Sequence, residues 1–334
     1  DFIQKEKPDL IAFETKTPVI KQHWKIINEI KGFIPKGTVP KILLLGDHVT
    51  ALPEESFQNS EVDFVLTGGD YDFLLFNLCQ YLDSANRESL TENHNLEPGI
   101  YYREDNQIKN TGQFQLNHDL NELPFIDRDL TKWKLYSSKN GNYKRIPGTY
   151  IMSGRDCWWG KCSFCSWKTL YPKFRARSAN NVLNEIGTLI YRYTVREIMD
   201  DSGSLPVGDW LKEFCNGMIA TGYNKKVYLD CNMRFGALAE QDYRLMKKAG
   251  FRLILFGLES ANQNTLDRIN KNMKVRDIIE GCKMATKAGL YPHITIMFGY
   301  PWETYEDALN TLKLGRWLFN QGFAYTMQAP MVIP

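Results

Sequence analysis

The sequence predicts an α/β protein built from two units, and three observations lead to this fold class. The chain has 334 residues, and since domains usually run to ~100–200 residues, it has room for two separate cores. From Tyr150 onward, short β-branched or apolar runs alternate with segments of helical period, which is typical of repeated βα units around a parallel sheet. A smaller version of this alternation occupies the start of the chain. We therefore expect a partial (β/α)6 barrel of TIM-like type, preceded by a smaller, doubly wound α/β unit of Rossmann-like type.

The larger unit is expected to contain six strands. They are Thr149–Ser153, Val195–Asp200, Lys226–Cys231, Arg252–Leu258, His293–Phe298 and Ala324–Val332. Amphipathic segments such as Ala179–Tyr193 and Glu306–Phe319 lie between them, with apolar residues at helical spacing. Because a helix separates consecutive strands, the strands should run parallel, with their carboxyl ends on one rim.

The smaller unit shows three strands and two segments of helical character. These are the strands Leu10–Phe13, Lys41–Leu45 and Asp63–Leu66, and the helical segments His23–Lys31 and Asp72–Leu82. The stretch that follows lacks a sustained period and reads as a linker with a short hairpin around Asn106. We therefore divide the chain into residues 1–97, a linker 98–145 and a barrel unit 146–334. Because there is no initiator Met and the last residues read as a strand that stops, we expect a chain truncated at both ends.

Composition restricts the partners and the compartment. With 41 basic and 39 acidic residues, the chain has no electrostatic footprint for nucleic acid, and we expect a small-molecule or peptide substrate. No apolar run approaches the ~20 residues of a membrane span, and the start lacks a secretory layout, so we expect a cytoplasmic protein. Cysteines 79, 215, 231 and 282 sit singly in apolar segments, which predicts core positions rather than disulfides.

A loop with three closely spaced cysteines carries the strongest chemical signal. Cys157, Cys162 and Cys165 lie directly after the first strand of the larger unit, where βα barrels keep their active sites. Three thiolates on one loop suit an oxygen-sensitive iron–sulfur cubane that leaves one iron without a protein ligand. Zinc is the alternative, but it needs four ligands, and the five histidines are all distant in sequence. A redox Cys-x-x-Cys pair is a further alternative.

The loop resembles the cluster loop of the radical S-adenosylmethionine (SAM) superfamily, including the aromatic Phe164 before the last Cys. The resemblance spans Thr149 to Pro334, and a looser one covers Pro8 to Asp129, as in members with an N-terminal cobalamin-binding domain. The family spacing is Cys-x3-Cys-x2-Cys, whereas this chain has four residues in the first gap. Trp158, Trp159 and Trp167 are expected to shield the cluster from solvent.

The resemblance implies contacts to SAM at several strand ends. Asp200–Gly203 takes the position of the family's Gly-Gly-Glu-like segment, Gly257–Ser260 resembles Gly-x-Glu-Ser, and Ile294–Thr304 resembles the adenine-contacting strand. The residues implied are Phe164, Asp200, Asp201, Ser202, Gly203, Arg234, Glu259, Ser260, Gly299 and Gln328. Alternatives are helix capping for the two acidic turns, and surface or core roles for Arg234 and Gln328.

The smaller unit resembles a corrin-holding domain at two loops, Leu45–Glu55 and Leu66–Asp70. The resemblance implies cobalamin contacts at Gly46, His48, Thr50, Gly68 and Gly69. The chain has Gly46-Asp47 where the family more often has Gly-Gly, and it lacks the Asp-x-His-x-x-Gly segment that supplies an axial His. His48 as an ordinary loop residue is the alternative.

The function implied by the resemblance is reductive cleavage of SAM at a 4Fe-4S cluster to give a 5′-deoxyadenosyl radical. Cobalamin-dependent methyl transfer to an unactivated carbon is the expected outcome, with a flavodoxin or ferredoxin as external electron donor. Two alternatives stay open at this point. One is a radical SAM cyclase or oxidoreductase without cobalamin, and the other is a non-catalytic metal-binding interaction module.

Overall fold

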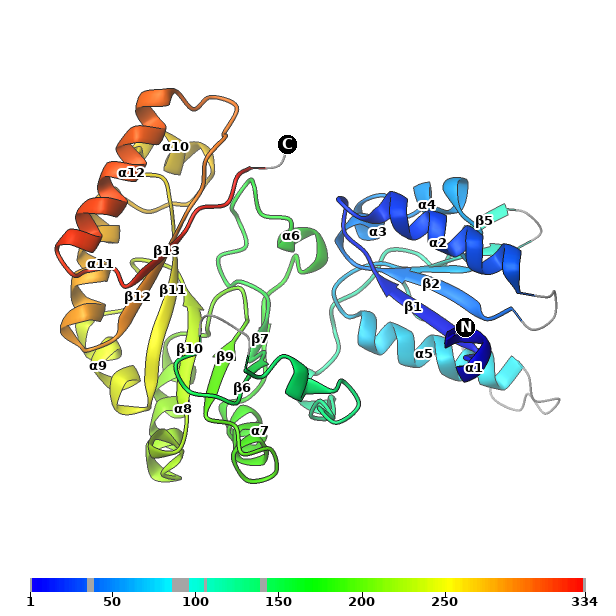
Figure 1. Ribbon diagram of the computed structural model, residues 1–334, viewed down its shortest axis with the longest axis horizontal. Coiled ribbons are helices and arrows are strands. Elements are labelled where there is room, and N and C mark those ends of the chain that lie inside the picture. The colour runs from blue at the N-terminus through cyan, green and yellow to red at the C-terminus, as the bar shows by residue number, and fades with distance from the viewer. Residues whose placement is uncertain (1, 35–38, 86–95, 105–106, 139–142, 333–334) are drawn as a thin grey trace. The chain divides into compact units, whose positions relative to one another are not determined.

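A computed structural model describes residues 2–34, 39–85, 96–104, 107–138 and 143–332. The chain divides into two compact units (Figure 1). The first unit comprises Asp1–His118 and Ser166–Pro172, and the second comprises Asp119–Cys165 and Lys173–Pro334. The chain therefore passes from one unit to the other within the stretch predicted to be a linker, and again just after Cys165.

The first unit contains a five-stranded sheet of order β1-β2-β3-β4-β5. Its strands are β1 (Leu10–Glu14), β2 (Lys41–Leu45), β3 (Phe64–Leu66), β4 (Ile100–Glu104) and β5 (Gln107–Asn110). The first three are parallel, whereas β4 and β5 are added antiparallel. The predicted linker thus begins with two strands of this sheet. Asn106, at the predicted hairpin, lies outside the described residues, but β4 and β5 on either side of it pair as a hairpin requires.

Helices cover both faces of this sheet, as predicted for an α/β unit. They are α1 (Phe2–Glu6), α2 (Ile20–Phe33), α3 (Asp47–Ala51), α4 (Glu55–Asn59) and α5 (Tyr71–Ala85). Along β2, Ile42 and Leu44 pack with α2, while Leu43 and Leu45 pack with α5 on the other face. This division follows from the alternation of side chains along a strand. Two separate apolar layers therefore hold the unit together.

The second unit contains six parallel strands in the order β13-β12-β11-β10-β9-β6. They are β6 (Gly148–Ile151), β9 (Glu197–Asp200), β10 (Tyr228–Met233), β11 (Phe251–Glu259), β12 (Tyr291–Ile296) and β13 (Thr326–Gln328). This arrangement confirms the predicted partial barrel, and β6 and β13 are its two open edges. The last strand is much shorter than predicted. Beyond it, only the isolated bridge between Phe298 and Met331 continues the pairing, because Pro330 has no N–H to donate.

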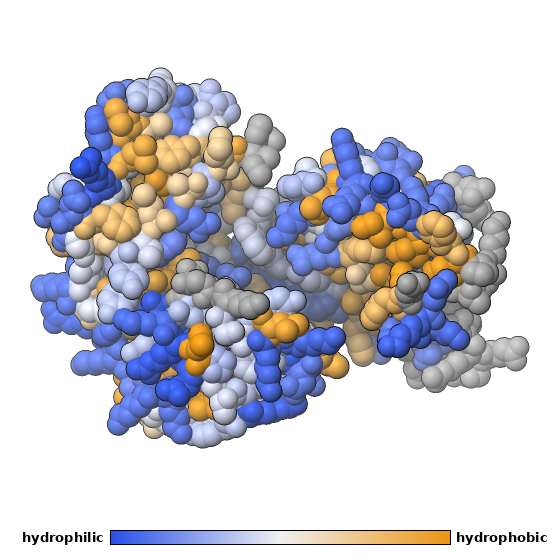
Figure 2. All heavy atoms as spheres, viewed as in Figure 1, coloured by the Kyte–Doolittle hydropathy of each residue, from blue (hydrophilic) through white to orange (hydrophobic). Residues whose placement is uncertain are grey.

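Helices follow these strands and cover the outer side of the sheet (Figure 1). They are α7 (Ala179–Tyr191), α8 (Asp209–Ala220), α9 (Glu240–Lys248), α10 (Gln263–Arg268), α11 (Val275–Lys287) and α12 (Tyr305–Asn320). Ser178 caps α7, and Thr304 forms a capping box with Asp307 at the start of α12. Figure 2 shows apolar side chains among hydrophilic ones over α12, where Leu312 and Trp317 are partly exposed. None of the described helices has the length and apolar character needed to cross a membrane.

The single cysteines mostly lie in the core. Cys215, Cys231 and Cys282 are buried, as predicted, but Cys79 is exposed, so the prediction is wrong there. Leu74 and Leu78 form the buried face of α5, and one residue further turns the helix by about 100° away from that face.

A buried charge network joins the amino-terminal halves of three barrel strands. The Arg252 guanidinium on β11 donates to Glu197 on β9 at 2.7 Å and to Asp230 on β10 at 2.9 Å. All three side chains are at most 4% exposed. Burial raises the pKa of Asp230 to about 8, the Arg252 charge opposes this shift, and the Glu197 charge adds to it. Two carboxylates therefore share one guanidinium, and burial beside the Glu197 charge favours the protonated form of Asp230.

This proton makes the stability of the second unit depend on pH. The folded protein holds the Asp230 proton up to about pH 8, whereas an unfolded Asp loses it near pH 3.8. The free energy of unfolding therefore falls as pH rises through that window. Asp230→Asn cannot ionise, so we expect its stability relative to the wild type to increase from about pH 5 to about pH 8. Urea unfolding followed by circular dichroism at both pH values measures this, and an unchanged difference contradicts it.

Candidate functional site

The cysteine loop leaves the carboxyl end of β6 and returns through a short ribbon. Strands β7 (Gly154–Arg155) and β8 (Arg175–Ala176) pair antiparallel at the base of the loop. Cys157, Cys162 and Cys165 are half-buried and form no disulfide. Nowhere in the described part of the chain do three His, Cys, Asp or Glu side chains converge as ligands of a single metal ion. The three thiols are thus spread along one loop at the rim of the barrel.

The loop is docked on the turn that follows α10. The backbone N–H of Ser163 donates to the carbonyl of Ile269 at 3.0 Å, and the indole Nε1 of Trp159 donates to the carbonyl of Asn270 at 3.0 Å. The side chain of Asn270 donates in turn to the carbonyl of Lys161 at 3.1 Å. Asn270 adopts a left-handed backbone with φ of 54°, which Asn tolerates better than most residues. This turn was not predicted from the sequence, although Asn270-Lys-Asn272 is a turn signal.

Charged side chains meet beside Cys162. Glu259, at the end of β11, pairs with Lys271 at 2.6 Å, and both side chains are largely buried. Burial raises the pKa of the Cys162 thiol, and the charges of Lys271 and Arg234 oppose this rise. Burial would lower the pKa of Lys271, but Glu259 and Cys162 raise it above its ordinary value, so the ammonium stays charged. The predicted residues Cys157, Cys162, Arg234 and Glu259 are therefore brought together, with Lys271 as an addition.

Arg234 follows β10 and contacts the loop directly. Its guanidinium lies over the ring of Trp159, 4.2 Å from the ring centroid. Its Nη2 donates to the carbonyl of Asn272 at 2.7 Å and also to the carbonyl of Lys271. The side chain is 9% exposed, so the surface role considered for it is wrong.

The turn after β9 is tied to the end of β6. The Asp200 carboxylate accepts from the backbone N–H of Ser202 at 3.0 Å, and Ser202 Oγ accepts from the N–H of Gly154 at 2.9 Å. Asp200 and Ser202 are buried, whereas Asp201 and Gly203 are exposed. The residue that caps α8 is Gly208, so this turn is not the N-cap of the helix.

Asp156, immediately before Cys157, reaches the same turn. It is 4% exposed, and its Oδ1 has no hydrogen-bond partner among the described residues. Burial raises its pKa to about 6, with the Asp201 charge adding to the shift and the N–H groups of Gly203 and Cys157 opposing it. A Cβ on Gly203 would stand 2.0 Å from Asp156 Oδ1. Sequence reasoning missed Asp156, because a single Asp before a Cys carries no signal.

Glu259 and Ser260 have different roles at the end of β11. Asn262 occupies the N-cap position of α10, so Glu259 is not its cap. Ser260 is fully buried, and its Oγ accepts from the backbone and side-chain nitrogens of Asn262, each at 3.1 Å. Ser260 therefore braces the start of α10. Glu259 has φ of 61°, a left-handed value that is strained for this residue type.

Three further predicted residues lie around the rim. Phe164 is half-buried, with the Lys271 ammonium 6.0 Å from its ring centroid. Gly299 has φ of 87°, and the atom nearest to a Cβ there would be 3.9 Å away. Gln328 is exposed on β13.

Tyr300, next to Gly299, was not predicted. Burial raises the pKa of its hydroxyl well above the ordinary range, and the charges of Glu259, Glu303 and Cys162 add to this.

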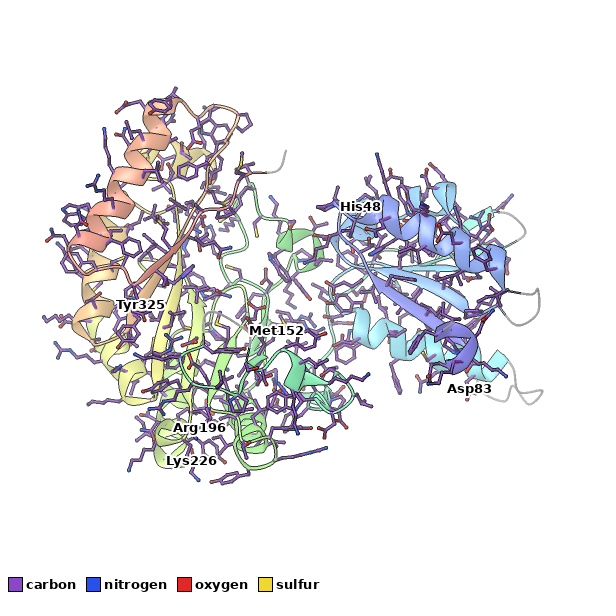
Figure 3. The ribbon with its side chains drawn as sticks, viewed as in Figure 1. His48, Asp83, Met152, Arg196, Lys226 and Tyr325 are labelled. Carbon is purple, nitrogen blue, oxygen red and sulfur yellow. The ribbon has the colours of Figure 1, made fainter. Side chains whose placement is uncertain are left out.

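The five predicted cobalamin residues of the first unit all contact their own unit. Both ring nitrogens of His48, labelled in Figure 3, are engaged, by Thr17 at 3.1 Å and by Glu55 at 3.0 Å. Thr50 Oγ1 donates to the carbonyl of Gly46 at 2.7 Å and accepts from the N–H of Gly68 at 3.0 Å. These contacts brace the loops that follow β2 and β3.

Chain atoms also cover the glycines at these strand ends. A Cβ on Gly46 would lie 2.4 Å from the Thr15 carbonyl oxygen, and one on Gly68 would lie 2.4 Å from the Phe114 ring. At Gly69 the Tyr171 ring would be 1.9 Å away. Tyr171 follows the short helix α6 (Trp167–Leu170), whose Leu170 carbonyl accepts from the Gly69 N–H at 3.0 Å. Trp167 stacks on Tyr171 within the first unit.

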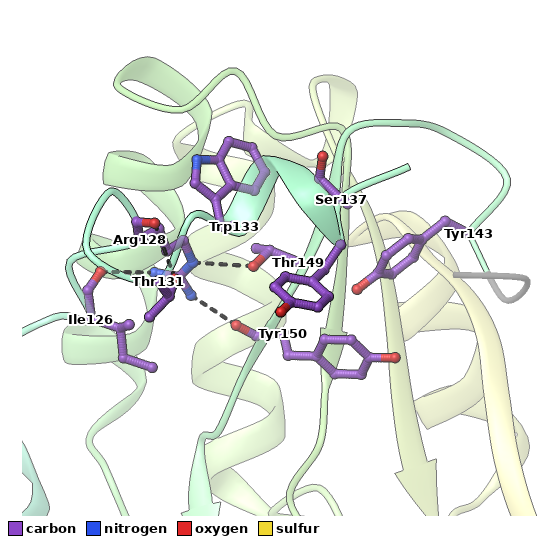
Figure 4. Close-up of a pocket in the computed structure, with 10 residues that line it drawn as sticks. Ile126, Arg128, Thr131, Trp133, Ser137, Tyr143, Thr149 and Tyr150 are labelled. Atoms are coloured by element: carbon purple, nitrogen blue, oxygen red, sulfur yellow. Dashed lines mark hydrogen bonds between the residues drawn. The ribbon is translucent and has the colours of Figure 1, made fainter. Parts of the chain in front are cut away.

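A separate cavity of about 380 Å³ lies in the second unit beside β6 (Figure 4). It is lined by Ile126, Arg128, Thr131, Trp133, Tyr136, Ser137, Tyr143, Gly148, Thr149 and Tyr150. Figure 4 shows the Arg128 guanidinium directed to Ile126, Thr149 and Tyr150, and it also pairs with Glu185 at 3.2 Å. The charge in this cavity is therefore already compensated. None of the residues predicted to bind a cofactor lines it.

Comparison with known families agrees with the geometry of the cysteine loop. Residues 151–315 match the model of the Radical SAM superfamily, so the second unit contains a radical SAM domain. An uncharacterised methyltransferase of Pyrococcus horikoshii is 23% identical, with 98% of this chain and 68% of the relative covered. The anaerobic magnesium-protoporphyrin IX monomethyl ester cyclase of Rubrivivax gelatinosus is 22% identical, with 93% of this chain and 54% of the relative covered.

Two solved structures resemble the fold of this chain over most of its length. The radical SAM methyltransferase TsrM from Kitasatospora setae, with cobalamin and a [4Fe-4S] cluster bound, has a TM-score of 0.71 at 14% identity, covering 97% of this chain and 62% of that one. The cobalamin-dependent radical SAM enzyme OxsB has a TM-score of 0.72 at 18% identity, covering 93% of this chain and 44% of that one. At such identities the likeness shows the fold. The chain spans less than two thirds of the length of either structure.

The close approach of Asp156 to Gly203 can be tested by a double-mutant cycle. Gly203→Ala places a methyl group against the buried carboxylate, and overpacking of this kind typically costs about 1–3 kcal/mol of unfolding free energy. In an Asp156→Ala background the same change should cost less, with a coupling of about 0.5–3 kcal/mol. Urea unfolding of the four proteins measures the coupling. Equal costs in both backgrounds would show that the carboxylate does not occupy this position.

Proposed function

We propose that this chain, which carries a radical SAM domain over residues 151–315, holds a 4Fe-4S cluster on Cys157, Cys162 and Cys165 and cleaves SAM reductively. The observation that carries the proposal is the cysteine loop itself. Three half-buried thiols lie at the carboxyl end of the first barrel strand, with the buried cations Arg234 and Lys271 beside them.

The chemistry of the donor set fits such a cluster. Thiolates bind iron only when deprotonated, and burial by itself raises the pKa of the Cys162 thiol. The Lys271 and Arg234 charges oppose that rise and so favour the thiolate. Three thiols on one loop leave a fourth iron open to a substrate. When bound, the cluster supplies the electron that splits SAM into methionine and a 5′-deoxyadenosyl radical.

The residues at neighbouring strand ends suit the parts of SAM. The carboxylates of Asp156 and Asp201 meet at the turn after β9, where an ammonium group would gain charge-assisted hydrogen bonds. Gly299 carries no side chain, and its φ of 87° gives the backbone a conformation that suits the approach of a flat base.

Aromatic side chains serve to exclude water. Trp159 is held by a hydrogen bond and by Arg234, Phe164 packs against the core, and Tyr300 stacks on Trp302. A radical that escapes reacts with solvent or backbone, so a dry, rigid rim protects the reaction. An external donor of the flavodoxin or ferredoxin type in the cytoplasm would supply the electron.

We further propose cobalamin-dependent methyl transfer to an unactivated carbon as the overall reaction. The support is the fold likeness to TsrM and OxsB, which includes the first unit. The local fit is poor in this structure, since Phe114 covers Gly68, Tyr171 covers Gly69 and His48 has both nitrogens engaged. A corrin would have to displace the two rings, and we derive no step through it. The cyclase relative favours ring formation as the second candidate.

Single substitutions in the loop test the cluster. After reconstitution, the wild type should hold about four irons and four sulfides per chain. One of the three thiolates is removed in each of the variants Cys157→Ala, Cys162→Ala and Cys165→Ala, so we expect each variant to lose this iron and sulfide. Formation of 5′-deoxyadenosine from SAM under a strong reductant should be abolished as well. The exposed Cys79 provides the matched control, and Cys79→Ala should keep both properties. Bound zinc without SAM cleavage in the wild type would instead support the interaction-module alternative.

Corrin uptake tests the second part of the proposal. After incubation with hydroxocobalamin and desalting, the wild-type chain should retain corrin absorbance in the visible range. Tyr171→Ala uncovers Gly69 and should bind corrin at least as tightly as the wild type. If neither protein retains corrin, cobalamin-dependent methyl transfer fails and ring formation or oxidation without cobalamin becomes the preferred reaction.

A further inference from the structure

Arg234 is a buried cation without an ion-pair partner among the described residues. Within the described part of the chain no carboxylate forms an ion pair with it, and its Nη1 is buried without a hydrogen-bond partner. Burying such a donor without a partner is unfavourable, and more so for a charged group. An unmatched guanidinium in this position therefore indicates a missing acceptor.

The contacts of Arg234 occupy Nη2 and one face of the guanidinium and leave Nη1 for that acceptor. Two carbonyls, those of Lys271 and Asn272, hold Nη2, and the Trp159 ring holds one face of the guanidinium at 4.2 Å. Burial lowers the pKa of Arg234, and the charges of Cys162, Cys157 and, more weakly, Asp277 oppose this shift. Both thiols are thus within electrostatic reach of the guanidinium. They belong to the same loop as the ring that clamps it.

Lys271 provides an instructive contrast. It is as deeply buried as Arg234 and also acts on Cys162, but its ammonium is neutralised by Glu259 at 2.6 Å. The Glu259–Lys271 pair adds no net charge to the site, whereas Arg234 adds a full positive charge. Arg234 is therefore a cation beside the loop whose charge no ion pair among the described residues offsets.

We infer that the Nη1–H group of Arg234 donates a hydrogen bond to a sulfur atom of the cluster held on the cysteine loop, and that Arg234 thereby raises the reduction potential of the cluster. Hydrogen bonds to cluster sulfurs and nearby charge are recognised means of setting such potentials. Reduction adds one negative charge to a cluster that is already anionic with its thiolates, and a fixed cation stabilises that charge. This inference rests on the proposed cluster but assigns Arg234 to the cluster rather than to SAM.

The test is the midpoint potential of the cluster in Arg234→Gln, measured without SAM by a reductive titration followed by electron paramagnetic resonance. Gln removes the charge at a similar size. We expect the ratio of reduced to oxidised cluster at a fixed potential to fall at least tenfold, which is about 59 mV for a one-electron couple. Arg234→Lys keeps the charge and should retain most of the wild-type potential.

Arg268→Gln is the matched control. Arg268 also lies over a tryptophan, 4.1 Å from the ring centroid of Trp302, but it is exposed. Its replacement should leave the potential unchanged. If Arg234→Gln binds the wild-type amount of iron with an unchanged potential, Arg234 is only a brace for the loop and the inference fails. If the wild type itself binds no cluster, the proposed function fails, which is a different result.

A second measurement covers the case in which Arg234→Gln loses its iron. Pulsed electron paramagnetic resonance of the reduced wild-type cluster, with arginine labelled by ¹⁵N, detects nitrogen hydrogen-bonded to the cluster. We expect a ¹⁵N coupling in the wild type and in Arg268→Gln, and its disappearance in Arg234→Lys. Absence of the coupling in the wild type would overturn the inference without any variant.

Discussion

The cluster proposed for the cysteine loop would bring negative charge into the second unit, and cations at the neighbouring strand ends lie where they can balance it. Thiolates in a half-buried position are costly unless cations or donors lie next to them. Arg234 after β10 and Lys271 after α10 meet that need from two directions, while Glu259 at the end of β11 neutralises one of them. The positions of these side chains follow from the parallel sheet, which brings the ends of β10 and β11 to the same rim as the end of β6.

The parts of this arrangement that depend on local pattern were predictable from sequence. The alternation of strands and helices gave six parallel strands in the expected places, because the period of apolar residues changes between the two kinds of element. Asp200–Gly203 and Glu259 were identified through the family resemblance, which places contacts to SAM at the ends of these strands. Boundaries were less accurate where pairing depends on a neighbour, as at β13, where a Pro interrupts the ladder, and at β4 and β5, which complete the first sheet.

Other residues of the site depend on contacts between distant segments, and no local pattern announces them. Asn270 holds a loop that lies more than a hundred positions earlier in the chain, and Asp156 reaches the turn after β9. The glycines of the first unit show the opposite error. Gly68 and Gly69 were predicted to expose their backbone to cobalamin, but the rings of Phe114 and Tyr171 fill that space. A glycine indicates a close approach without indicating which atoms approach.

The four-residue gap between Cys157 and Cys162 is explained by the contacts that this part of the loop makes with the turn after α10. Within this gap, Trp159 both donates to the Asn270 carbonyl and stacks on Arg234, and the Lys161 carbonyl accepts from Asn270. Gly160, between them, takes φ of 58°, which lets the backbone turn so that both neighbours reach the same partner segment. A gap longer than the family spacing therefore does not simply loosen the loop. It supplies the residues that fix the loop to the turn after α10, and it holds the guanidinium of Arg234 beside the thiols.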